Sequence, residues 1–189
     1  VGARVFGSRR AADITSGYED KAFPAFWEGQ RSVIKDSLPL DDQMFPRIFS
    51  EKTPDHFARA GDMEGPSFEY HMFVSATGLD ITEREFERAA ERVFNLERAL
   101  LVRNHGRNRA MDELVIPYFA RPEWWSNPVT GQKHALDATQ FAGLLDEYYA
   151  LRGWERREGR PTRAKLFQLG LDDVADELGR LGLLPAEEL

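Results

Sequence analysis

The sequence predicts an all-α domain of about six to eight helices. In the most periodic segment, apolar residues recur at three- and four-residue steps, and few segments show the two-residue alternation of a half-buried strand. Capping residues and glycine stops flank several of the helix-like segments. With 189 residues, 42% of them hydrophobic, the chain is long enough to bury a core.

The first helix-like segment covers residues 17–38. Pro24 suits a first turn, where its fixed φ and missing N–H are tolerated. Pro39 disfavours helical geometry at Leu38, so we expect the helix to end about there. The apolar anchors of this helix are Phe23, Phe26, Trp27, Val33 and Ile34.

The middle of the chain is predicted to hold short helices followed by one long helix. Residues 50–78 contain prolines and glycines that break any helix into short pieces. The strongest helix covers 80–104, where Thr82 and Glu85 form a capping-box pattern. Glu and Arg alternate on one of its faces, which indicates a solvent-facing or ion-paired side. Its apolar face contains Phe86, Ala89, Val93, Leu96 and Leu100.

The last third begins with a mostly irregular segment, 104–136, and then becomes helical again. Asp137 and Gln140 start a helix that Gly153 ends. Thr162 is expected to cap a short helix over 163–168, and Asp172 another over 173–181. The apolar face of the first of these helices contains Phe141, Leu144, Leu145, Tyr148, Tyr149 and Leu151.

Composition and motifs exclude several classes of function. The net charge of −7 argues against binding to a nucleic-acid backbone, which needs a dense basic face. No apolar run approaches the roughly 20 residues that cross a bilayer, and no signal peptide is visible. There is no cysteine, no G-x-S-x-G and no H-E-x-x-H, so we expect no metal ligated by this chain. These features predict a cytoplasmic protein.

The segment VIKDSLPLDDQMFP, residues 33–46, attracts attention because carboxylates surround a short apolar turn. Asp36 precedes Leu38–Pro39–Leu40, and Asp41 and Asp42 follow it. One interpretation is a solvated helix end followed by a turn. The other is a loop that holds a large polar ligand.

The string LLDEYYALRGWERREGRPTRAKLFQLGL, residues 144–171, indicates a helix, a glycine stop, a basic turn and a capped helix, which favours a scaffold role for most of its residues. Its pattern EYY-x-LRGW…G-x-PT…KL…LGL also resembles the C-terminal signature of the aldehyde:ferredoxin oxidoreductase family. Residues 91–117 are similar to that family's long helix and the segment after it, and ATG at 76–78 has a counterpart. The resemblance covers residues from about 30 to 182, and it implies a tungsten or molybdenum bis-pterin oxidoreductase.

The resemblance implies that the 36–42 loop contacts a pterin. Asp36 would be the main acceptor of pterin N–H groups, with further contacts from Ser37, Leu40 and Asp41. Pro39 stands where the family has Gly, which stiffens the loop. Asp41 stands where many members carry a cysteine ligand of a [4Fe–4S] cluster, and a carboxylate is a harder ligand than a thiolate. The cluster then lacks its usual fourth ligand, is absent, or is completed differently in the full enzyme.

The resemblance also implies an organisation and a reaction. Residues 1–35 would form a first helical region, 36–42 the pterin-contact loop and 43–189 a helical domain. The chain begins with Val, so we expect a piece of something longer or a processed subunit. The implied reaction converts an aldehyde and water to a carboxylate and passes two electrons to a ferredoxin-like iron–sulfur carrier. Without the N-terminal cofactor-binding portion or subunit, we expect residues 1–189 to be inactive.

Other interpretations stay open at this point. Members of the same family could instead reduce an aromatic acyl-CoA or oxidise a hydroxy acid, and a small aldehyde or acid is the expected substrate class. The chain could also be a non-catalytic helical module that binds no cofactor. Four polar residues after the strongest helix are candidates for a substrate funnel, with an internal ion-pair network as the alternative: Arg103, His105, Arg109 and Asp112.

Overall fold

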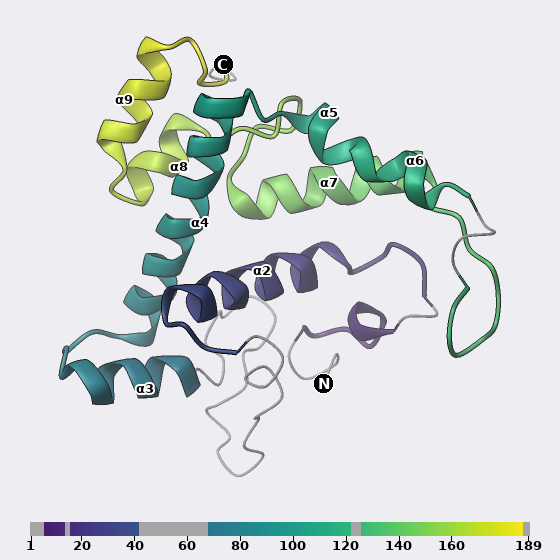
Figure 1. Cartoon of the computed structure of the whole chain (residues 1–189), viewed down its shortest axis with the longest axis horizontal. Helices are drawn as coiled ribbons and strands as arrows, with labels where there is room; N and C mark the ends of the chain where they lie inside the picture. The colour runs from purple at the N-terminus through teal and green to yellow at the C-terminus, as the bar shows by residue number, and fades with distance from the viewer. Residues whose placement is uncertain (1–5, 14–15, 42–67, 122–125, 187–189) are drawn as a thin grey trace.

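The structure, a computed structural model, describes residues 6–13, 16–41, 68–121 and 126–186 (Figure 1). Within these ranges every regular element is a helix, and β-type pairing is limited to two isolated bridges, Ser126–Lys133 and Trp154–Pro161. The predicted all-α class is therefore confirmed. The elements are η1 (Arg10–Ala12), α2 (Ala22–Ser37), α3 (Phe68–Thr77), α4 (Glu83–His105), α5 (Arg109–Asp112), η4 (Glu113–Val115), α6 (Ile116–Phe119), α7 (Ala138–Arg152), α8 (Arg163–Gln168) and α9 (Asp172–Arg180).

The long helix α4 connects two hydrophobic clusters. In Figure 1, α2 and α7 lie side by side on one side of α4, while α8 and α9 lie on the other. Near its start, Phe86 and Ala90 pack with Val33 and Ile34 of α2. Near its end, α4 packs against α8 and α9 in a cluster that comprises Ala99, Val102, Leu166, Leu169, Leu171, Ala175 and Leu178.

Most helix ends lie where capping chemistry predicts them. The Thr82–Glu85 capping box starts α4, and the Asp137 side chain accepts from the Gln140 N–H at 2.8 Å to start α7. Gly153, at the end of α7, has the left-handed backbone that a glycine adopts without steric cost. The prediction for Asp172 is wrong, because Asp172 is the first helical residue of α9 and makes no capping hydrogen bond there.

The predicted apolar faces of α4 and α7 are only partly correct. On α4, Val93 and Leu100 are exposed while Arg98 is buried. The reason is that α4 contacts different partners along its length, so its buried positions do not follow one stripe. On α7, Leu151 is exposed and Arg152 is buried, because polar groups of α2 meet the Arg152 guanidinium.

The segment predicted to be mostly irregular, 104–136, contains helical turns from Arg109 to Phe119. The Asn108 side chain caps the first of them by accepting from the Met111 N–H at 3.1 Å, and this signal was missed. Short helices are predicted over 50–78; residues 50–67 of that segment lie outside the described ranges, and α3 occupies 68–77. Across the described ranges, no helix has the length and apolar character to cross a bilayer.

Candidate functional site

The segment 36–41 lies at the C-terminal end of α2. Asp36 and Ser37 are the last helical residues, and the Leu40 N–H donates to the Lys35 carbonyl oxygen at 2.8 Å, which closes the bend. Asp36, Ser37 and Asp41 are exposed on this chain, and Leu40 is half-buried. The predicted contact residues therefore share one short surface segment. Asp42 lies outside the described residues.

The 36–41 segment carries several groups that accept hydrogen bonds. Two carboxylates and a hydroxyl offer acceptors, and the end of α2 adds the negative pole of a helix dipole. N–H donors of a pterin would form charge-assisted hydrogen bonds with such groups. The pockets between α4 and its neighbours are lined by other residues. Among the described residues, the 36–41 segment is thus an exposed surface at the end of α2, and it lines none of these pockets.

Asp112, on α5, is the acceptor at the centre of a half-buried network. It accepts from Arg98 at 3.0 and 2.5 Å, from the Arg107 Nε at 2.8 Å and from the Tyr149 hydroxyl at 2.6 Å. Burial alone would raise the pKa of the Asp112 carboxyl, but these hydrogen bonds and the Arg98 charge lower it below the ordinary value. Burial and the bond to Asp112 raise the pKa of Tyr149. The network therefore holds Asp112 ionised and Tyr149 protonated.

Arg109 extends this network from α5 to α7. Its Nη1 donates to the Asp146 carboxylate at 2.5 Å and its Nε to Glu113 at 2.7 Å. Its guanidinium also lies 5.6 Å from the Tyr149 ring centroid. Although burial lowers the pKa of Arg109, the two carboxylates outweigh it and raise that pKa. Arg109 and Asp112 thus belong to one ion-paired assembly that fixes α5 against α4 and α7.

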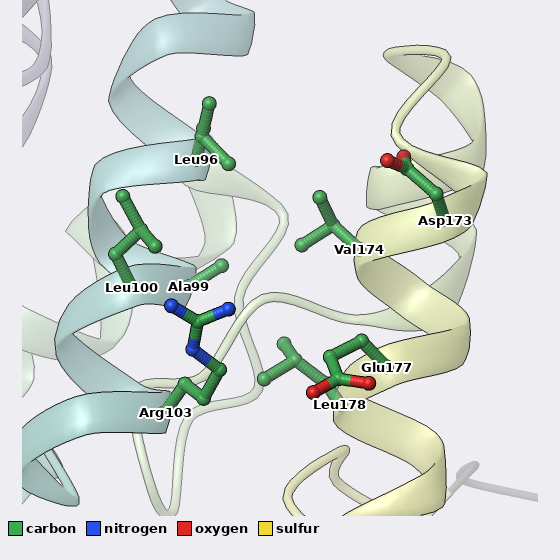
Figure 2. Close-up of a pocket in the computed structure, with 8 residues that line it drawn as sticks. All are labelled: Leu96, Ala99, Leu100, Arg103, Asp173, Val174, Glu177 and Leu178. Carbon is green, nitrogen blue, oxygen red and sulfur yellow. The ribbon is translucent and has the colours of Figure 1, made fainter.

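The other two funnel candidates lie elsewhere. His105 is the exposed last residue of α4. Arg103 is exposed too, and it borders a pocket of about 210 Å³ between α4 and α9. Figure 2 shows Arg103 extending from α4 toward α9, where Glu177 lies on the opposite helix. The structure therefore brings together two of the four candidates and separates them from Arg103 and His105.

A second pocket, of about 300 Å³, adjoins the Asp112 network between α4 and α7. Aromatic side chains form much of its lining, including Phe94, Tyr148, Tyr149 and Trp154. Arg98 stacks 4.6 Å from the Trp154 ring centroid, and the Trp154 indole N–H donates to Asn95 at 2.8 Å.

Sequence reasoning missed Arg98, Arg107 and Tyr149 as members of this assembly. Tyr149 lies in the string 144–171, where the sequence favours a scaffold role, and Arg98 lies on the alternating Glu/Arg face of α4. For Arg98, the signal that could have found it is the mismatch between a buried helix position and a charged residue. In the described part of the chain, no group of three or more His, Asp or Glu side chains is arranged to hold a metal ion.

Comparison with known proteins adds two findings. The sequence model of the family described as aldehyde ferredoxin oxidoreductase, domains 2 and 3, matches residues 5–171. A solved structure, the active site complex BamBC of benzoyl coenzyme A reductase in complex with 1,5 dienoyl-CoA, matches 93% of this chain with a TM-score of 0.62. At 23% sequence identity that likeness shows a shared fold, and this chain covers 23% of the length of the matched chain.

Proposed function

The chain belongs to the aldehyde ferredoxin oxidoreductase family, and on that premise we propose that it supplies the helical part of a tungsten or molybdenum bis-pterin oxidoreductase. The family match over residues 5–171 carries this proposal. The bound metal–pterin group supplies the two-electron chemistry, and the protein binds and orients it. The proposal assigns the remaining walls of the cofactor site to a portion outside this chain.

The contribution of this chain to binding is the exposed end of α2. The Asp36 carboxylate would accept pterin N–H groups, and Ser37, Leu40 and Asp41 would complete the contact. Charge-assisted hydrogen bonds of this kind contribute about 1.5–3 kcal/mol each. An exposed carboxylate at a helix end supports the proposal, because a second polypeptide portion can reach it without rearrangement of α2.

The proposed reaction is the oxidation of an aldehyde. An aldehyde and water give a carboxylate, protons and two electrons, which pass to a cytoplasmic iron–sulfur carrier of the ferredoxin type. Arg109 and Asp112 are engaged in ion pairs, so they would shape the wall of a substrate funnel rather than touch the substrate. Arg103 and His105 are exposed and stay candidates for contacts nearer its opening.

A second candidate reaction is the reduction of an aromatic acyl-CoA. The matched solved structure favours it, since that complex is a benzoyl coenzyme A reductase with 1,5 dienoyl-CoA. The two reactions are distinguished by assays on the protein that contains the cofactor-bearing portion. Aldehyde-dependent reduction of a viologen dye supports the first reaction, and dienoyl-CoA formation from benzoyl-CoA and a low-potential reductant supports the second.

Metal analysis of an Asp36→Asn variant tests the proposed site. In the protein that contains the cofactor-bearing portion, we expect tungsten or molybdenum retention after dialysis to fall about 10-fold or more, because a charge-assisted acceptor is lost. Asp80→Asn is the matched control, since Asp80 is an exposed aspartate in the loop before α4. Equal retention in both variants would exclude the Asp36 contact. A colourless, metal-free wild-type protein would instead support the non-catalytic helical module.

A further inference from the structure

Arg152, the last residue of α7, is fully buried, and no ion pair among the described residues includes it. Its Nη2 donates to the Phe26 carbonyl oxygen at 2.9 Å, its Nη1 to the Gln30 side chain at 3.3 Å and its Nε to the Tyr148 hydroxyl at 3.1 Å. Two of these three acceptors belong to α2. The Glu91 carboxylate favours the charged form of Arg152, but its ion-pair partner is Lys165. A buried cation that lacks a paired carboxylate is costly unless other groups compensate for the lost water.

Aromatic rings supply that compensation. The guanidinium carbon lies 3.6 Å from the ring centroid of Phe94, 4.3 Å from that of Phe26 and 5.2 Å from that of Tyr148. Cation–π contacts strengthen when the cation is desolvated, as it is here. The three rings come from α4, α2 and α7, so Arg152 lies where these helices meet.

Gly29 of α2 admits the guanidinium to this position. A Cβ atom at residue 29 would lie 2.8 Å from the Arg152 Nη2 and 3.3 Å from a ring carbon of Phe94. A glycine inside a helix is disfavoured by about 1 kcal/mol relative to alanine, so helix propensity does not explain this residue. The close approach of the Arg152 guanidinium explains why residue 29 is a glycine.

We propose that Arg152 is a positioning residue that sets the axial and rotational position of α2 and thereby aims the 36–41 segment at the cofactor. Apolar packing is non-directional, whereas hydrogen bonds to Phe26 and Gln30 fix the helix in one register. Gln30 adds a bond to α4, donating to the Glu87 carbonyl oxygen at 2.6 Å. Asp36 follows Gln30 by six residues, about 9 Å along the helix, so a shift at the anchor moves the carboxylate. This inference rests on the proposed function.

Two variants perturb the anchor by different means, and a third is the control. Arg152→Met removes the directional bonds but keeps an unbranched apolar side chain among the rings. Gly29→Ala keeps Arg152 and raises helix propensity, but its Cβ displaces the guanidinium. Arg163→Met removes another arginine that stacks on a ring, Phe167 at 5.4 Å, on a helix remote from α2 in Figure 1.

The experiment uses the protein that contains the cofactor-bearing portion and measures metal per chain after dialysis, the thermal midpoint and amide hydrogen exchange of residues 34–41. We expect Arg152→Met and Gly29→Ala to retain about 10-fold less metal and to exchange faster at 34–41, with Arg163→Met like wild type. Wild-type retention and exchange in both anchor variants would overturn the inference. If Arg152→Met does not fold, Gly29→Ala decides alone.

The readouts separate this inference from the proposed function. A wild-type protein without tungsten, molybdenum or pterin refutes the proposed cofactor. Without a cofactor to position, the proposed role of Arg152 is refuted as well, whatever the exchange data show. A metal-containing wild type with unaffected anchor variants refutes only the role of Arg152.

Discussion

Asp112→Asn should lower the free energy of unfolding by about 3–5 kcal/mol, because it leaves the buried charge of Arg98 without its carboxylate partner. Asp112 is the shared acceptor of Arg98, Arg107 and Tyr149, and its side chain is 12% exposed. Asparagine keeps the shape of the side chain but offers one carbonyl oxygen in place of two charged oxygens. The measurement is chemical denaturation at neutral pH, followed by circular dichroism.

The matched control is Asp176→Asn. Asp176 also pairs with an arginine, Arg163, at 2.8 Å, but its side chain is 73% exposed. Exposed ion pairs contribute about 0–1 kcal/mol, so this variant should differ little from wild type. Equal effects of the two substitutions would contradict the assignment of Asp112 as the buried acceptor.

The same network predicts a pH dependence. The folded-state pKa of Asp112 lies below its ordinary value of 3.8, so the unfolded chain takes up a proton first as the pH falls. The stability that Asp112 contributes is complete above its ordinary pKa and is lost as the pH falls through the lower folded-state pKa. Between about pH 6 and pH 3, wild type should therefore lose more unfolding free energy than Asp112→Asn. A parallel loss in the two proteins would show that Asp112 is not the group responsible.

Local signals in the sequence were enough to predict the longer helices, α2, α4 and α7, but not the short turns from Arg109 to Phe119. Thr82 and Asp137 mark helix starts because their side chains satisfy N–H groups that the helix leaves unpaired, and this chemistry is complete within about four residues. Burial was harder to predict. Val93 lies at an apolar periodic position but is exposed, because which face of α4 is covered depends on helices distant in the sequence.

The residues of the candidate site also differ in whether the sequence alone could predict them. Asp36 could be singled out from its local setting, a carboxylate just before a proline-stiffened bend, and from the family resemblance. Arg152 could not, because its importance comes from Phe26 and Gln30, which precede it by 126 and 122 residues. A charged residue in a helix is expected to be solvated unless its acceptors are known. Such residues become visible only when the tertiary contacts are in place.

Leu166→Ala should lower the free energy of unfolding by about 2–5 kcal/mol, since it leaves a cavity in a closely packed cluster. Leu166 has no exposed surface, and it packs with Val102 of α4 and Leu178 of α9. Helices as short as α8 and α9 are not stable alone, so this cluster is what holds them on α4. Chemical denaturation measures the loss.

Leu181→Ala is the control for that substitution, because it removes the same atoms from a leucine that is 43% exposed. We expect it to cost less than half as much as Leu166→Ala, since an exposed side chain gives up little buried area and leaves no cavity. A comparable loss at both positions would mean that α8 and α9 are held by something other than the cluster around Leu166. The contrast therefore tests whether α4 organises the domain through its C-terminal core, independently of any cofactor.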